Sequence, residues 1–157
     1  KKKRQKRKME KIEINLTENR IYLDFLDYST KLSDDIIKLL KKDIAQRFLG
    51  IDKMKIIISQ ILENKKPERC RIIEVGGSGE FAIFCNDLGL PCYYWTDNTE
   101  LMKFVTFRLN KYKATMVNNI SLRESNLVFN DDWDYIYVCD NKFENEIRKF
   151  QKLEKIM

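Results

Sequence analysis

A glycine-rich turn and a later aspartate are the two features of this sequence whose residue types and spacing could bind a ligand. Residues 76–79 read GGSG and follow an apolar run that ends at Val75. Glycines let the backbone approach a ligand closely and adopt positive φ, and a helix that follows offers unpaired N–H groups. Asp97 comes about twenty residues later, where a carboxylate can accept hydrogen bonds from both hydroxyls of a ribose. The pair predicts a ligand that contains a nucleoside.

Each of these features also has a purely structural interpretation. The glycines could form a tight strand-to-helix turn that binds nothing, because short glycine motifs are weakly specific. Asp97 could cap the following helix, and Glu74 could accept hydrogen bonds from the N–H groups of its own loop. For these two carboxylates the structural and ligand-binding roles are compatible. The aromatic run Tyr93, Tyr94 and Trp95 could stack on bases, but a strand packed on both faces is its commoner origin.

Missing and scattered residue types exclude other chemistries. The chain has no His, so it has no Ser-His-Asp or Cys-His catalytic group, no imidazole base and no His-ligated metal. The cysteines form no C-x-x-C pair, so we expect free thiols and no metal site at Cys70, Cys85, Cys92 and Cys139. No stretch approaches the roughly 18 apolar residues that a membrane helix needs. We therefore expect a cytoplasmic protein without a membrane partner.

The positive charge of the chain lies almost entirely in residues 1–8, which read KKKRQKRK. The 157 residues include 30 Lys and Arg and 24 Asp and Glu, which gives a net charge of +6. Without the seven cations of this run, 23 basic residues remain against 24 acidic ones. We expect a disordered tail. It could bind RNA or another nucleic acid, serve as a nuclear localisation signal in a eukaryotic or viral source, or be a solvated end.

The elements around the glycine turn alternate between strand and helix. This alternation predicts an α/β fold with a mainly parallel sheet and right-handed crossovers. Apolar runs predict strands at 71–75, 92–96, 114–118 and 135–139, and amphipathic patterns predict helices at 80–88, 99–112 and 143–157.

The part of the chain before this alternation is expected to be mainly helical. Ser33 is a good N-cap and Gly50 a good stop, which predicts one helix between them. Asp52 is a second N-cap, which predicts another helix ending near Asn64.

Two further segments precede these helices. Residues 11–16 favour a short strand or an extended lead-in, and residues 21–28 fit either a helix or a strand. Pro67 breaks any continuing helix and opens the alternating part. The predicted organisation is a basic tail at 1–8, a helical segment at 9–66 and an α/β core at 67–157.

The alternating part resembles the class I S-adenosylmethionine-dependent methyltransferases, a family with a Rossmann-like fold. The resemblance rests on EVGGSG at 74–79, YYWTDNTELMKFVTFRLNK at 93–111 and DDWDYIYVCDNKFEN at 131–145. It implies a three-layer sandwich that binds S-adenosylmethionine and transfers its methyl group to an acceptor. The acceptor, a small molecule, an RNA or a protein, is not identified by the sequence.

The resemblance also implies roles for individual residues. It places Glu74 and the glycine turn around the methionine part, and Asp97 on the ribose. Asp140 is the candidate general base. The other implied cofactor contacts are Gly76, Gly77, Ser78 and Gly79 in the turn, Asn98, Asn118 and Asn119 near the adenine, and Cys139 on the floor of the cleft.

Three features depart from the family pattern. The turn is one residue tighter than the usual G-x-G-x-G, and the residue after the third strand is Asn instead of Asp. The last three strands of the usual seven-stranded sheet are missing. The sequence therefore leaves three explanations open: the chain is a fragment of a longer protein, a partner protein completes the sheet, or the catalytic form of the family is not preserved. In the last case the chain is a non-catalytic scaffold or nucleic-acid-binding module in a larger complex.

Overall fold

The computed structural model describes residues 20–120, 128, 132–139, 141–143 and 145. The basic tail at 1–8, the predicted strand at 11–16 and the candidate base Asp140 lie outside these residues. The predicted helix at 143–157 also lies outside them, except for residues 143 and 145.

Four parallel strands form one sheet in the order β3-β2-β1-β4. Val75 of β1 pairs with Trp95 of β2 on one side and with Val138 of β4 on the other, so the carboxyl ends of these strands meet at one edge. The strand order reverses between β1 and β4, which is where doubly wound sheets bind ligands. The predicted α/β fold with a parallel sheet is confirmed. The strands are β1 (Ile72–Val75), β2 (Cys92–Trp95), β3 (Val117–Asn119) and β4 (Tyr135–Val138).

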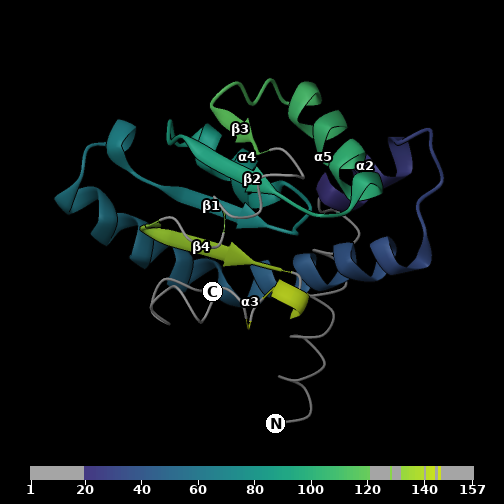
Figure 1. Ribbon diagram of the computed structural model, residues 1–157, viewed down its shortest axis with the longest axis horizontal. Coiled ribbons are helices and arrows are strands. Elements are labelled where there is room, and N and C mark those ends of the chain that lie inside the picture. Colours follow the sequence, from purple (N-terminus) through teal and green to yellow (C-terminus); the bar gives the residue numbers. More distant parts are fainter. Residues whose placement is uncertain (1–19, 121–127, 129–131, 140, 144, 146–157) are drawn as a thin grey trace, which may run out of the picture.

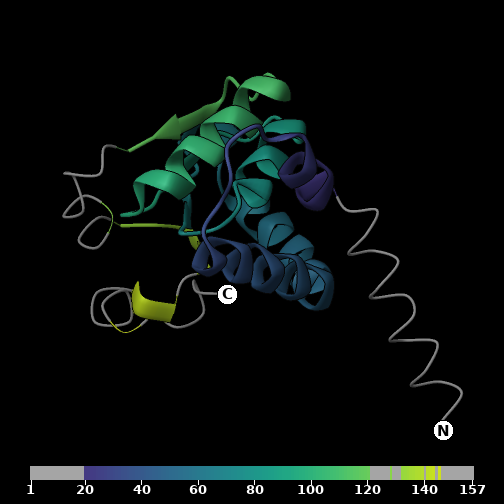
Figure 2. The same ribbon diagram turned by 90° about the vertical axis from the view of Figure 1, so that its right-hand side faces the viewer.

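The described α-helices all lie on one face of the sheet (Figure 2). Alternate strand residues point to opposite faces, so Ile72, Cys92 and Tyr137 pack under the helices. Residues of the other face, such as Trp95, pack instead with Trp133 and with Phe143 of the short 3₁₀ helix η2 (Asn141–Phe143). The expected third layer stays a prediction. The α-helices are α2 (Arg20–Asp27), α3 (Asp34–Asn64), α4 (Glu80–Asp87) and α5 (Thr99–Lys111), and η1 (Pro67–Arg69) is a second 3₁₀ helix.

Helix α3 is continuous and spans nearly the whole width of the described fold (Figure 1). The predicted stop at Gly50 and the predicted cap at Asp52 are therefore wrong. Both halves of α3 pack on the core, Leu40 in one cluster and Ile58 in another. Burial of both halves outweighs the roughly 1 kcal/mol that a glycine costs inside a helix. The ambiguous segment 21–28 is helical and lies within α2 apart from its last residue.

The third strand begins at Val117, later than the predicted start at residue 114. Helix α5 ends through a left-handed residue, Lys113, whose φ is 51°. Ala114 then donates a backbone hydrogen bond to Leu109 O at 2.9 Å and packs under the helices. Ala114 therefore packs with the residues that end α5 and does not open β3. Its buried apolar side chain resembles that of a strand residue, which is why the sequence pattern predicted a strand there.

Candidate functional site

The glycine turn at 76–79 joins β1 to α4 at the carboxyl edge of the sheet, and every residue in it is buried. Gly76 and Gly79 adopt positive φ of 70° and 87°, which side chains other than glycine rarely adopt. Gly77 is required for a different reason, because a Cβ there would lie 2.2 Å from Oε2 of Glu74. The turn geometry and the close approach of Glu74 explain all three glycines.

Glu74 points into the start of α4 and is completely buried. Its Oε2 accepts a hydrogen bond from the N–H of Gly79 at 2.8 Å, and its Oε1 accepts one from Ala82 at 2.9 Å. Two of the otherwise unpaired donors at the helix N-terminus are thereby satisfied, and the charge complements the helix dipole. Glu74 thus has the structural role that the sequence left open for it.

Asp43 of α3 supplies a second buried carboxylate at the turn. Its Oδ2 accepts a hydrogen bond from the N–H of Ser78 at 2.8 Å, and the hydroxyl of Tyr137 donates to its Oδ1. All three side chains are completely buried. Because Ser78 follows β1 and Tyr137 belongs to β4, Asp43 lies between the two strands where the strand order reverses. The sequence analysis did not identify it.

Helix α3 makes two more contacts at the same edge. Lys42 Nζ donates to the backbone oxygen of Cys139 at 2.7 Å, and Gln46 Nε2 donates to that of Val138 at 3.0 Å. Three polar side chains of one helix therefore close over the ends of β1 and β4.

The carboxylates of Glu74 and Asp43 place negative charge around the turn. Burial raises the pKa of Tyr94 well above its usual range, and the charges of Glu74 and Asp43 raise it further. Burial, and then the charge and the hydrogen bond of Asp43, raise the pKa of Tyr137 in the same direction. Tyr94 donates to Gly77 O at 2.6 Å. Both hydroxyls therefore act as neutral donors.

A buried arginine ties α2 to the same turn. Nε of Arg108 in α5 donates to Asp24 Oδ2 at 2.7 Å, its Nη1 donates to Ser78 O at 2.9 Å, and its Nη2 donates to Glu80 Oε1 at 2.6 Å. Burial lowers the pKa of this guanidinium, but the neighbouring carboxylates of Glu80 and Asp24 outweigh that effect and raise it. With three acceptors in fixed directions, the guanidinium holds the turn in place.

Asp97 follows β2 at the same edge, and about a third of its side chain is exposed (35%). Its Oδ2 forms an ion pair with Nζ of Lys142 in η2. Because η2 follows β4, this pair reaches across the end of β1, which lies between the two strands. Asn98, and not Asp97, caps α5, since its side chain accepts a hydrogen bond from Leu101 N at 2.9 Å.

The remaining predicted site residues are distributed unevenly. Cys139 is buried at the carboxyl edge, where its N–H donates to Val75 O at 3.1 Å. Asn118 and Asn119 lie on the outer strand β3, which β2 separates from β1. Among the aromatic residues of β2, Tyr94 and Trp95 are buried, as expected of a packed strand.

The fit of a nucleoside cofactor differs between the two ends of this site. The partly exposed carboxylate of Asp97 offers the acceptor chemistry that a ribose needs. At the turn, the N–H groups of Ser78 and Gly79 already have carboxylate partners within the chain. The β2 end thus carries an acceptor of the kind that a ribose needs, which pairs with Lys142 in this structure, whereas the turn does not offer these two donors in this conformation.

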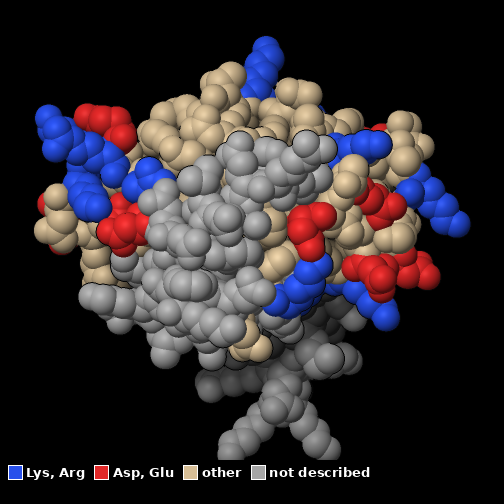
Figure 3. Space-filling view, in the orientation of Figure 1, with Lys and Arg blue, Asp and Glu red and all other residues tan. Residues whose placement is uncertain are grey.

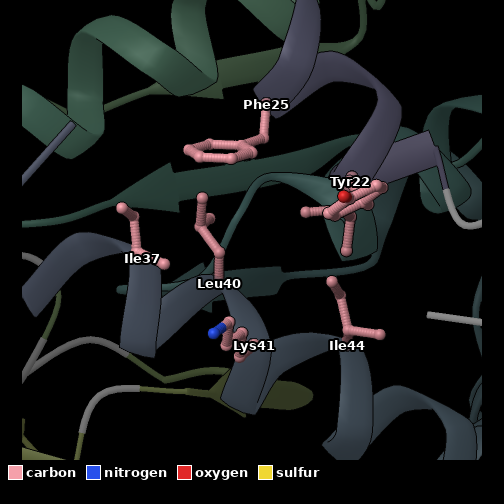
Figure 4. A pocket seen from close by; sticks show the side chains of 7 residues that line it. Tyr22, Phe25, Ile37, Leu40, Lys41 and Ile44 are labelled. Atoms are coloured by element: carbon pink, nitrogen blue, oxygen red, sulfur yellow. The ribbon is translucent and has the colours of Figure 1, made fainter. Parts of the chain in front are cut away.

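A separate pocket lies between α2 and α3. Its volume is about 50 Å³, and its lining is apolar apart from Lys41 and the hydroxyl of Tyr22 (Figure 4). Binding sites for small molecules usually measure roughly 300 Å³ or more and carry several polar groups. This pocket is too small and too apolar for a nucleoside. It is lined by Ile21, Tyr22, Phe25, Ile37, Leu40, Lys41 and Ile44.

Charged side chains of both signs share the face of the molecule seen in Figure 3, where the described Lys and Arg lie among Asp and Glu. All four cysteines are buried free thiols. Within the described ranges, no three Cys, Asp or Glu side chains are grouped as metal ligands. No helix in the described part of the chain is both long enough and apolar enough to cross a membrane.

Comparison with known proteins found no matching family model, curated protein or solved structure. A functional proposal therefore rests on the residues of this chain.

Proposed function

We propose that this chain is a methyltransferase-like α/β domain that binds S-adenosylmethionine at the carboxyl edge of its sheet and passes the methyl group to an acceptor. The observation that carries the proposal is the position of Asp97. It is a partly exposed carboxylate that follows β2, beside the glycine turn that follows β1, in a parallel sheet of order β3-β2-β1-β4. A carboxylate at that place suits the two hydroxyls of a ribose.

The bound cofactor would supply an electrophilic methyl group. The contribution of the chain would be to orient the nucleoside through Asp97 and to hold the acceptor in line, which can supply a large part of a rate enhancement. A positioned acceptor needs no strong base, and Asp140 is the candidate where one is needed. The acceptor is proposed as a small molecule, an RNA or a protein, in the cytoplasm or, for a eukaryotic source, the nucleus.

Titration calorimetry with S-adenosylhomocysteine, the demethylated cofactor, tests the role of Asp97. Hydrogen bonds to a charged group contribute about 1.5–3 kcal/mol, so Asp97→Ala should weaken binding about tenfold or more. The matched control is Asp35→Ala, at an exposed position in the first turn of α3, and it should bind like the wild type. Equal affinities of Asp97→Ala and the wild type would contradict the proposed ribose contact.

A second candidate function is a non-catalytic scaffold with this fold. The hydrogen bonds from Ser78 N–H to Asp43 and from Gly79 N–H to Glu74 favour this function. A turn whose N–H groups already have partners within the chain needs no ligand. A partner's strand would pair with β4, the outer strand at the opposite side of the described sheet from β3. Under this proposal, Asp97→Ala would bind the partner as tightly as the wild type, whereas disrupting the outer edge of β4 would abolish binding.

We propose residues 1–8 as an RNA-binding arm, whether the domain is an enzyme or a scaffold. Its seven cations would make binding strongly dependent on salt. Deleting the arm should weaken RNA binding at low salt far more than at high salt. Unchanged binding would show that residues 1–8 do not bind RNA.

A further inference from the structure

We propose that the chain itself occupies both ends of the cofactor site, so that this structure is a closed form which the ligand must open. The inference rests on the proposed function and assigns a blocking role to Asp43 and Lys142. Asp43 presents a carboxylate, as the methionine part of the cofactor would, and Lys142 presents a hydrogen-bond donor, as the ribose would.

Asp43 occupies the turn end of the site. S-adenosylmethionine carries a carboxylate on its methionine part, and the N–H groups at a helix N-terminus are suited to such an anion. In the structure the carboxylate at Ser78 N–H is that of Asp43, which comes from α3 and not from the turn or the helix that follows it. It is held in place by the hydroxyl of Tyr137. A ligand carboxylate could take this donor only after Asp43 moves away.

Lys142 occupies the ribose end. Its ammonium lies against Asp97 Oδ2, where the hydroxyl groups of a ribose would donate. Lys142 is mostly exposed (58%), so its side chain can turn away at little cost. The 3₁₀ helix η2 that carries Lys142 can stay in place while this side chain turns. Phe143 anchors η2, because its ring packs edge-on against Trp95 with ring centroids 5.0 Å apart.

The two blocks should differ in strength. Exposed ion pairs change equilibria by a factor of up to about five. A buried carboxylate with two donors is held more firmly, because hydrogen bonds to a charged group are about twice as strong as neutral ones. We therefore expect release of Asp43 to limit binding, and release of Lys142 to contribute less.

The test measures the affinity for S-adenosylhomocysteine in single variants that weaken one block each. Asp43→Asn keeps an oxygen that can accept from Ser78 N–H but removes the charge, and it should bind about five to ten times more tightly than the wild type. Lys142→Gln lies on the surface, so it cannot unfold the core, and it should bind about three times more tightly. Glu63→Gln in α3 and Lys103→Gln in α5 are exposed controls and should match the wild type.

The outcomes separate this inference from the proposed function. Tighter binding by Asp43→Asn and Lys142→Gln supports the closed form, even where the wild type binds too weakly to measure. Equal or weaker binding by both, with clear binding by the wild type, overturns the closed form alone, because Asp43 would then only position the turn. No binding by any of these proteins at millimolar ligand overturns both.

Discussion

Nε of Arg108 lies 2.7 Å from Oδ2 of Asp24, and both side chains are completely buried. The pair joins α5 to α2 across 84 positions of sequence. Since Arg108 also donates to Ser78 O, one guanidinium connects the glycine turn to α2.

Replacing Arg108 by Met should cost about 3 kcal/mol or more, because it removes the fully buried cation of the ion pair with Asp24 and leaves that buried carboxylate only partly compensated. Urea unfolding would measure the change. Lys111→Met removes an exposed cation from the same carboxylate and should cost much less. Equal losses in the two variants would show that burial of the pair is not what matters.

Stability should fall in acid through Asp24. Burial raises the pKa of this carboxyl, but hydrogen bonds from Lys111, Arg108 and Tyr112 outweigh burial and lower it below its usual value. Its stabilisation is therefore fully present above the pKa of an unfolded aspartate, about 4, and is lost as pH falls through the lower folded value. Asp24→Asn lacks this contribution, so its deficit relative to the wild type should shrink between pH 6 and pH 3 in urea titrations. A deficit that stays constant over that range would contradict the account.

Gly77→Ala tests the packing of Glu74 under the turn. The new methyl group would lie 2.2 Å from Glu74 Oε2, and the displaced carboxylate would lose its bonds to α4, for an expected loss of about 3 kcal/mol. Gly89→Ala is the control, because its φ of 75° is strained but no atom lies within 4 Å of the new Cβ, for a loss of about 1 kcal/mol. Thermal unfolding in which Gly77→Ala loses no more than Gly89→Ala would exclude the clash.

The strands and helices around the turn could be predicted because each carries its own local signal. The run Ile72–Val75 is buried on both faces and is followed by glycines, and α4 ends at Asp87, shortly before Gly89 with its positive φ. Strand β2 and helix α5 follow with equally clear patterns. The order of the strands and the alignment of their carboxyl ends are products of pairing between distant segments, and only the structure gives them.

The residues that surround the turn could not be predicted, because α2, α3 and α5 bring them there from far along the chain. A local signal was nevertheless present. Asp43 lies on the apolar face of its helix, three residues after Leu40, and Arg108 lies four residues after Phe104 on the buried face of α5. A charged residue within an apolar stripe must find a partner, and these two find theirs at the turn.

Gly50→Ala tests the continuity of α3. In the interior of a continuous helix, alanine is favoured over glycine by about 1 kcal/mol, so the variant should be more stable than the wild type in urea unfolding. If Gly50 ended a helix with positive φ, as the sequence alone predicts, the same change would destabilise the protein.

Calorimetric titration of the 157-residue chain with S-adenosylhomocysteine tests the central claim most directly. The account predicts saturable one-to-one binding that Asp97→Ala weakens about tenfold or more and Asp43→Asn strengthens. No saturable heat from either the wild type or Asp43→Asn at millimolar ligand would contradict it.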